Sequence, residues 1–365
     1  MRLRLTGALL AFALLLVTPA GSSRAAGPGD AMAALIAAAK AEGSIVVDGP
    51  PTDSVREALT TEFQKKYGIS VSYIASGGGP SGARVRAERA AGKYLLDVLI
   101  SGSDTPIVTF LPSGWLDRIE PILIEPDAVN PKDWQDGHVW YADPQHTILR
   151  LMRYVAAEVA VNTKLVKPQE IPTWRSLLDP KWKGKLLVKD PRLSGSGQTL
   201  NSYFYINFGP EYVRKLYVDQ QPVFTGDLRQ AAQWLAEGTY GVWVGTEFSQ
   251  LQPFIKAGYP IAPAQPSDGP GILTGGYSLV SLINRAPHPN AAKLFVNWLA
   301  GREGGTIFAK SLLAGSVRTD VKSSDWMASY SLVKPGVKYF DAYDYAFITH
   351  DREAALAKVK DLLGF

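Results

Sequence analysis

The chain has 365 residues, of which 46% are hydrophobic and 20% are charged, and it contains no cysteine. Without cysteine it has no disulfides, thiolate metal sites, cysteine nucleophiles or cysteine-linked lipid anchor. The formal net charge of +4 falls to +1 without residues 1–25, which hold Arg2, Arg4 and Arg24 and no acid, and a near-neutral remainder argues against a nucleic-acid partner.

The first 25 residues have the pattern of an export signal. Arg2 and Arg4 form a basic start, 8–17 is an apolar run, and Ser23-Arg24-Ala25 offers small residues for a signal peptidase. The apolar run is too short to span a bilayer, which takes about 20 residues. We therefore expect a cleaved signal peptide and a soluble periplasmic monomer; a buried N-terminal helix is the alternative.

The mature chain is too long for one hydrophobic core, so we expect two lobes. Asp30 can cap an expected helix over 31–42, and a strand is expected to follow at 44–48. A second helix opens at Thr52 or Asp53, and 69–75 is another strand. Strand, helix and strand in this order predict a parallel βαβ unit with a right-handed crossover.

Two polar loops follow strands in the first part of the chain. The loop 76–82 (SGGGPSG) matches G-x-G-x-x-G through Gly77, Gly79 and Gly82, but Pro80 and its place after the second strand argue against a dinucleotide site. Such glycines before a helix expose N–H groups suited to a polar or anionic ligand, although a tight turn is the alternative. The loop 101–105 (SGSDT) either caps a helix or faces a crevice.

The remaining elements alternate in the manner of a second α/β lobe. We expect long β segments at 138–143 and 148–162, which suit a crossing between lobes. The other expected elements are a buried strand after Trp174 and Trp182 that leads into a Ser/Gly loop at 194–197, a helix at 227–237, a strand at 240–244, a returning Pro/Gly-rich segment at 260–276, a strand at 277–283, and helices at 289–299 and 352–363.

No catalytic or metal-binding signature stands out. The histidines His138, His146, His288 and His350 are scattered, and there is no G-x-S-x-G elbow, P-loop or EF-hand loop. Carboxylates abound, but the sequence does not place a catalytic pair among them. We therefore expect a binding protein rather than an enzyme, without a cofactor or a bound metal.

Four segments of the chain carry a resemblance to a known family: LLDVLISGSD, DPKWKGKLLVKDP, YGVWVG and GGYSLVSLINRAPHPNAAKLFVNWL. They resemble the periplasmic solute-binding proteins of ABC importers, and the family 1, ferric-ion-binding-like group in particular. The resemblance implies a type II α/β fold with two lobes, crossing strands, a ligand bound between the lobes on closure and an inner-membrane permease as partner. It places lobe 1 at 26–142 and 268–310, lobe 2 at 143–267, and a helical brace of lobe 2 at 311–365.

The resemblance also implies which residues line the cleft. They come from the loops after strands in both lobes and from the Gly275-Gly276-Tyr277 turn near the hinge. The candidate ligand-binding residues are Gly77, Gly78, Ser81, Ser101, Ser103, Asp104, Arg192, Ser194, Gly195, Ser196, Gly197, Thr246, Glu247 and Tyr277.

One departure from the ferric members bears on the ligand. Those proteins carry adjacent tyrosines after the strand that matches 240–244, and this chain has Thr246-Glu247-Phe248 there. Tyr203 and Tyr205 are spaced so that they would not point together on a helix. We therefore expect a small polar organic solute, anionic or zwitterionic, in a cleft of hydroxyls, amides and aromatics such as Trp243.

An anionic solute would be met by Arg192 or Arg153, whereas a solvated loop charge is the alternative role for Arg192. Glu247 is either a ligand contact or a helix N-terminal acid favoured by the dipole. Ferric binding through other ligands, a periplasmic enzyme on the same scaffold and a receptor that reports to a sensor are the remaining alternatives.

Overall fold

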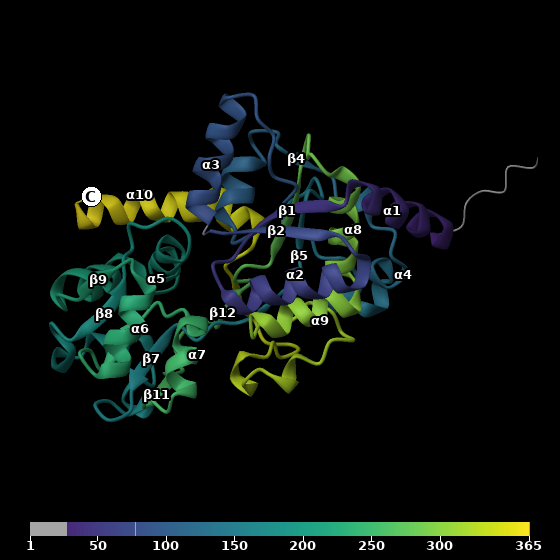
Figure 1. Cartoon of the computed structure of the whole chain (residues 1–365). Coiled ribbons are helices and arrows are strands. Elements are labelled where there is room, and N and C mark those ends of the chain that lie inside the picture. The colour runs from purple at the N-terminus through teal and green to yellow at the C-terminus, as the bar shows by residue number, and fades with distance from the viewer. Residues whose placement is uncertain (1–27, 77, 365) are drawn as a thin grey trace, which may run out of the picture.

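The computed structural model describes residues 28–76 and 78–364, and these form two α/β lobes joined by a small sheet (Figure 1). The expected signal peptide and Gly77 lie outside the described residues. Within the described part, every helix is too short or too polar to cross a membrane.

The first lobe is built on a six-stranded sheet in the order β2-β1-β3-β13-β4, with β5 also paired to β13. β1 runs parallel to β2 and β3, which confirms the expected βαβ unit, whereas β13 is antiparallel to its neighbours. The strands are β1 (Ser44–Gly49), β2 (Ser70–Ala75), β3 (Val98–Ser101), β4 (Leu116–Asp117), β5 (Ile148–Arg150) and β13 (Leu279–Ile283).

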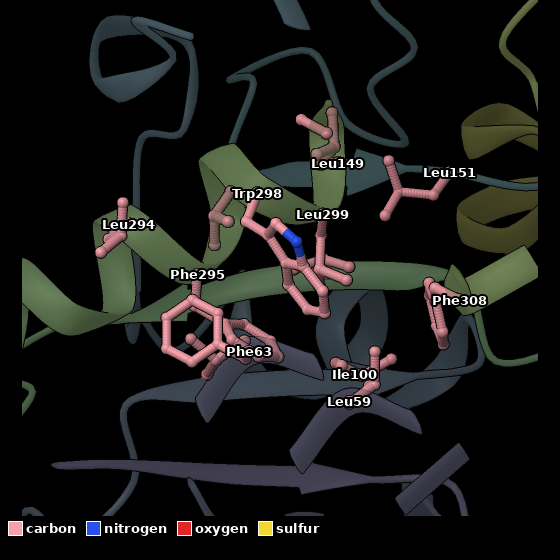
Figure 2. Packing of buried hydrophobic residues seen from close by; sticks show 14 of the residues in the cluster. Leu59, Phe63, Ile100, Leu149, Leu151, Leu294, Phe295, Trp298, Leu299 and Phe308 are labelled. Atoms are coloured by element: carbon pink, nitrogen blue, oxygen red, sulfur yellow. The ribbon is translucent and has the colours of Figure 1, made fainter. Parts of the chain in front are cut away.

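Helices cover this sheet and supply its main core. They are α1 (Pro28–Glu42), α2 (Asp53–Tyr67), α3 (Gly78–Ala90), α4 (Pro126–Val129), α8 (Pro289–Ala300) and α9 (Arg302–Ser311). Figure 2 shows residues of α2, α8 and α9 packed together with Ile100 of β3 and Leu149 of β5. Phe63 packs edge-on against Phe295 with ring centroids 4.9 Å apart. Burying one such side chain stabilises the fold by about 1.5–3 kcal/mol.

The second lobe is built on a five-stranded sheet in the order β11-β7-β10-β8-β9. Its strands are β7 (Val159–Asn162), β8 (Leu186–Lys189), β9 (Val223–Thr225), β10 (Val242–Val244) and β11 (Ile261–Ala264), and its helices are α5 (Ser196–Arg214), α6 (Leu228–Glu237) and α7 (Phe248–Lys256). β8, β9 and β10 run parallel, whereas β7 is antiparallel to β10 and β11.

Both faces of this second sheet are buried, as the short apolar runs predict. In β10, Val242 and Val244 belong to the core beneath α5, whereas Trp243 between them packs with α6 and α7. Successive side chains of a strand point to opposite faces, so a strand covered on both sides is an almost continuous apolar run.

The expected long strand at 148–162 is wrong, because it is three short strands in three different sheets. β5 pairs in the first sheet and β7 in the second. Between them β6 (Tyr154–Val155) pairs with β12 (Ile272–Thr274), which also pairs with β14 (Phe340–Asp341). This three-stranded sheet is where the chain crosses between the lobes.

The C-terminal helix α10 (Arg352–Leu363) matches its expected bounds and packs along α5 of the second lobe (Figure 1). The helical turn before it, Phe347–Asp351, contacts the first lobe at the turn Asp104–Phe110, here called η1. The expected lobe boundaries stay a prediction, and the strand pairing puts 148–150 with the first sheet.

Candidate functional site

A cavity of about 270 Å³ lies between the two lobes and the connecting sheet. A second cavity of about 140 Å³ adjoins it and shares Glu158, Ser196, Glu247 and Tyr277 with it. A volume at the low end of ligand sites suits a small solute.

Most of the lining comes from loops that follow strands. Gly102, Ser103 and Asp104 follow β3, Lys189 ends β8, and Glu247 comes just after β10. Ligand sites of α/β sheets lie at the carboxyl ends of parallel strands. Here the ends of β3 in one lobe and of β8 and β10 in the other line the same space.

The structure brings together most of the residues that the sequence singled out, which are otherwise far apart in the chain. Gly78, Ser103, Asp104, Ser194, Gly195, Ser196, Glu247 and Tyr277 line the larger cavity, and Thr246 lines the smaller one. Gly77 lies outside the described residues.

Four candidates do not line either cavity: Ser81, Ser101, Arg192 and Gly197. Ser81 is buried with its hydroxyl 2.6 Å from that of Ser76. Ser101 is also buried, and its hydroxyl donates to the carbonyl of Gly102 at 3.0 Å. Both side chains therefore hold the loops in place.

Arg192 binds a carboxylate two residues before it. Its Nε and Nη2 donate to Asp190 at 2.8 and 2.5 Å, and the Arg192 side chain is 56% exposed. The guanidinium lowers the pKa of the Asp190 carboxyl. Arg153, the other arginine proposed for an anion, instead lies over the Trp140 ring at 4.8 Å.

Trp243 is not a cleft aromatic, because it is fully buried among α6 and α7. Tyr154, Tyr277 and Tyr343 line the cavities instead. Burial raises the pKa of Tyr277 to about 12 and moves those of Tyr154 and Tyr343 upward as well. All three are neutral hydroxyls near neutral pH.

Asp104 joins the two lobes across the edge of the cleft. It begins η1 in the first lobe, and its carboxylate accepts hydrogen bonds from Arg352 Nη1 at 2.6 Å and Ser194 Oγ at 2.5 Å. Arg352 starts the helix that packs on the second lobe and is 4% exposed. The contacts favour a conformation in which the lobes touch.

Glu158 is a lining residue that the sequence did not indicate. Its carbonyl oxygen accepts the N–H groups of Gly245 and Thr246 at 2.7 and 3.3 Å, which fixes it beside the loop that carries Glu247. Burial raises the pKa of its carboxyl to about 7; Glu247 raises it too, and Lys189 opposes both.

Lys189 is the second lining residue that was missed, and it is 8% exposed. Gly245 packs directly over its stem: φ is +80°, and an added Cβ would lie 2.6 Å from Lys189 Cβ. The glycine therefore leaves the room that this lysine needs.

The missed residues carried only weak signals in the sequence. Glu158 interrupts an apolar run (AAEVAV), and Lys189 ends a strand of three aliphatic residues (LLVK). A charged residue at the edge of an apolar run is also the usual pattern at the end of a strand that has no function. Other missed lining residues include the polar side chains Thr199, Thr274 and Tyr343.

The Ser/Gly loop at 194–197 opens α5, a helix of 19 residues. The first N–H groups of a helix have no partner within it, and the helix dipole favours an anion there. Lys189, Ser196 and Thr199 line the same cavity. This wall suits a negatively charged group.

The start of α5 has no room for a side chain at Gly197. An added Cβ would lie 2.3 Å from the backbone oxygen of Asp190. We expect Gly197→Ala to lower the free energy of unfolding by about 1–3 kcal/mol in urea titrations, because backbone must shift. Gly79→Ala is the control, since nothing lies within 4 Å of its added Cβ; equal losses in both variants would contradict the expectation.

A resident metal finds little support in this donor set. The described residues contain no group of three or more histidine, aspartate or glutamate side chains that could hold a metal ion. Ferric ion prefers phenolate ligands, and burial raises the pKa of Tyr154, Tyr277 and Tyr343, which makes their deprotonation less favourable.

Comparisons with known proteins agree with this architecture. The model of the family described as bacterial extracellular solute-binding protein matches residues 48–306, more than half of the chain. An uncharacterized protein of Haemophilus influenzae is 25% identical over 337 residues, covering 89% of this chain and 92% of that protein.

Two solved structures share the fold. The periplasmic binding protein AfuA from Actinobacillus pleuropneumoniae, with exogenous fructose-6-phosphate bound, is 24% identical with a TM-score of 0.65, over 88% of this chain and 99% of that one. The substrate-binding protein of an ABC transporter from Agrobacterium tumefaciens is 17% identical with a TM-score of 0.70, over 88% and 94% of the two chains. The family model, with which the two-lobed fold and the cleft between the lobes agree, shows that the chain belongs to the bacterial extracellular solute-binding protein family.

Proposed function

We propose that this protein is the periplasmic solute-binding component of an ABC importer and that it captures a small polar organic solute with an anionic group. The observation that carries the proposal is the cleft itself, in which Lys189 and the start of α5 face Gly78, Ser103 and Asp104 of the other lobe. Residues 1–25 direct export and are then removed, and an inner-membrane permease receives the solute.

The mechanism is closure of the lobes about the three-stranded sheet. A ligand that contacts both lobes binds the closed form better and shifts the population toward it. The hydrogen bond between Ser194 and Asp104 already spans the cleft. Closure excludes water, so the contacts of the anionic group with Lys189 and the α5 N–H groups become stronger.

A thermal-shift panel tests the proposal. We would use inorganic phosphate, citrate, fructose 6-phosphate, small sulfonates, amino acids and ferric citrate with the mature protein. Saturation at 100 times Kd stabilises a protein by about 2.7 kcal/mol, which raises Tm measurably. Recovering the solute chemically unchanged separates binding from catalysis. No stabilisation by any compound, together with no solute in mass spectra of the natively purified protein, contradicts the proposal.

The ferric citrate sample in this panel tests the main alternative function, which is the binding of ferric ion. Tyrosine ligation would give a visible phenolate-to-iron charge-transfer band. We expect no band, because Thr246-Glu247-Phe248 stands where the ferric members have adjacent tyrosines.

A further inference from the structure

Glu158 and Lys189 are opposite charges that line one cavity without pairing. Among residues 28–76 and 78–364, neither side chain takes part in a hydrogen bond or an ion pair. The carboxylate oxygens of Glu158 and the ammonium nitrogen of Lys189 are not among the fully buried atoms without a partner in the described chain. Each charged group is therefore accessible from the cavity. Burying an unpaired charge is unfavourable. Both charges therefore lack partners that a ligand can supply.

The groups that face Glu158 make its position favourable for a cation. Glu247 beside it raises the pKa of the Glu158 carboxyl, and Lys189 on β8 is the one cation that lowers it. The charge of Glu158 also reaches Tyr154, Tyr203 and Tyr217, whose pKa values burial moves upward, so these tyrosines are neutral. The effects of Glu247 and Lys189 on Glu158 therefore oppose each other, and a further cation would favour the ionised Glu158 carboxylate.

We propose that the solute is a zwitterion whose ammonium group binds Glu158 while its anionic group binds Lys189 and the start of α5. The inference rests on the proposed function and adds the positive charge of the ligand. An ammonium donates three hydrogen bonds, and the carboxylates of Glu158 and Glu247 and the hydroxyl of Tyr277 line the same wall as acceptors. Each end of the solute then neutralises a charge that the empty cleft leaves unpaired.

Matched pairs of small anions test the ammonium site. Each pair differs only by an amino group: 2-aminoethyl phosphate and ethyl phosphate, 2-aminoethanesulfonate and ethanesulfonate, 3-aminopropanoate and propanoate. Calorimetric titration of the mature protein at pH 8 measures each affinity. We expect the amino member of at least one pair to bind at least ten-fold more tightly than its partner.

The isosteric variant Glu158→Gln tests whether the preference for amino compounds depends on the Glu158 carboxylate. We expect it to weaken the amino compound about ten-fold or more and to leave the amine-free partner unchanged or tighter, because the amide carries no charge. Glu237→Gln is the matched control, since Glu237 is an exposed α6 residue that lines neither cavity. It should match the wild type.

The pH profile gives a second readout. Burial raises the pKa of Glu158 to about 7 in the empty cleft, and a bound ammonium lowers it, so the amino compound releases protons and binds about ten-fold more weakly at pH 6 than at pH 8. The sulfonate pair is best here, because neither member titrates at its anion. Calorimetry in two buffers should show about half a proton released per site at pH 7, and none in Glu158→Gln.

The outcomes separate this inference from the proposed function. If the amine-free anion binds as tightly as its amino partner in every pair that binds, or if Glu158→Gln leaves the amino compound's affinity and proton release unchanged, the ammonium site is wrong and the solute-binding function stands. If no compound of these pairs or of the wider panel binds, both fail.

Discussion

Lys189→Met should abolish most of the binding without harming the fold. A hydrogen bond to a charged group contributes about 1.5–3 kcal/mol, and the anionic group of the solute would lose its only side-chain cation in the described cavity lining. We expect the affinity for the tightest anion of the panel to fall about 100-fold. Methionine has a similar length and fills the stem's place against Gly245.

The stability of the same variant should move in the opposite direction. Lys189 is 8% exposed and has no ion pair in the described part of the chain, so removing its charge relieves a desolvation cost. Glu158 loses the cation that holds its pKa down, and it then stays protonated at neutral pH. We expect the free energy of unfolding in urea at pH 7 to be unchanged or about 1 kcal/mol higher.

Lys183→Met is the control for both measurements, because this exposed lysine lies outside the two cavities. It should change neither affinity nor stability. Wild-type affinity in Lys189→Met, or a stability loss above about 2 kcal/mol, would show that the lysine supports the fold rather than the ligand.

Elements whose signals are local could be predicted from the sequence. The C-terminal helix has its expected bounds, and the helix expected at 227–237 appears as α6 with Asp227 capping it through bonds to two N–H groups. Caps and apolar spacing act within a few residues, so no distant part of the chain needs to be known.

Strand partners could not be predicted in the same way. The apolar segment 148–162 has the composition of one long strand, yet its pieces pair with β13, β12 and β10, which follow about 100 residues later. A pleated segment offers the same hydrogen bonds to any neighbour. Which neighbour it takes depends on the packing of both lobes.

The cleft residues also fall into those with a local sequence signal, which could be predicted, and those that depend on distant contacts, which could not. Loops such as 194–197 were predicted because serine and glycine after a strand mark a helix start and a polar edge. Glu158 and Lys189 are positioned by Gly245, which is distant from both in the sequence. The N–H of Gly245 donates to the carbonyl oxygen of Glu158, and its lack of a side chain leaves room for Lys189. Arg192 shows the converse, since its carboxylate partner stood two residues away in the sequence.

The ion pair between Asp104 and Arg352 should carry the largest single contribution to stability near the cleft. The guanidinium is 4% exposed and the Asp104 side chain 21% exposed. Removing one member of a buried pair costs about 3–5 kcal/mol, because the other charge stays buried without a partner. Asp104 keeps Ser194 and some access to solvent, so we expect Arg352→Met to lower the free energy of unfolding by about 2–3 kcal/mol.

A double-mutant cycle separates the pair from simple packing. Asp104→Asn strands the buried guanidinium and should cost about as much as Arg352→Met, whereas the double variant should recover most of the loss, giving a coupling energy of about 1–3 kcal/mol. Lys358→Met, an exposed change on the same helix, is the control. Additive losses would mean that the two residues act independently.

The same variants should loosen the contact between the lobes. Asp104 belongs to the first lobe, while Arg352 begins a helix that packs along α5 of the second. We expect the pair to break when the lobes open, so its removal should destabilise the closed form of the ligand-free protein relative to the open form. Small-angle scattering should give a larger radius of gyration for Arg352→Met than for the wild type, and saturating ligand should reverse it. An unchanged radius of gyration would mean that the pair between Asp104 and Arg352 does not break when the lobes open.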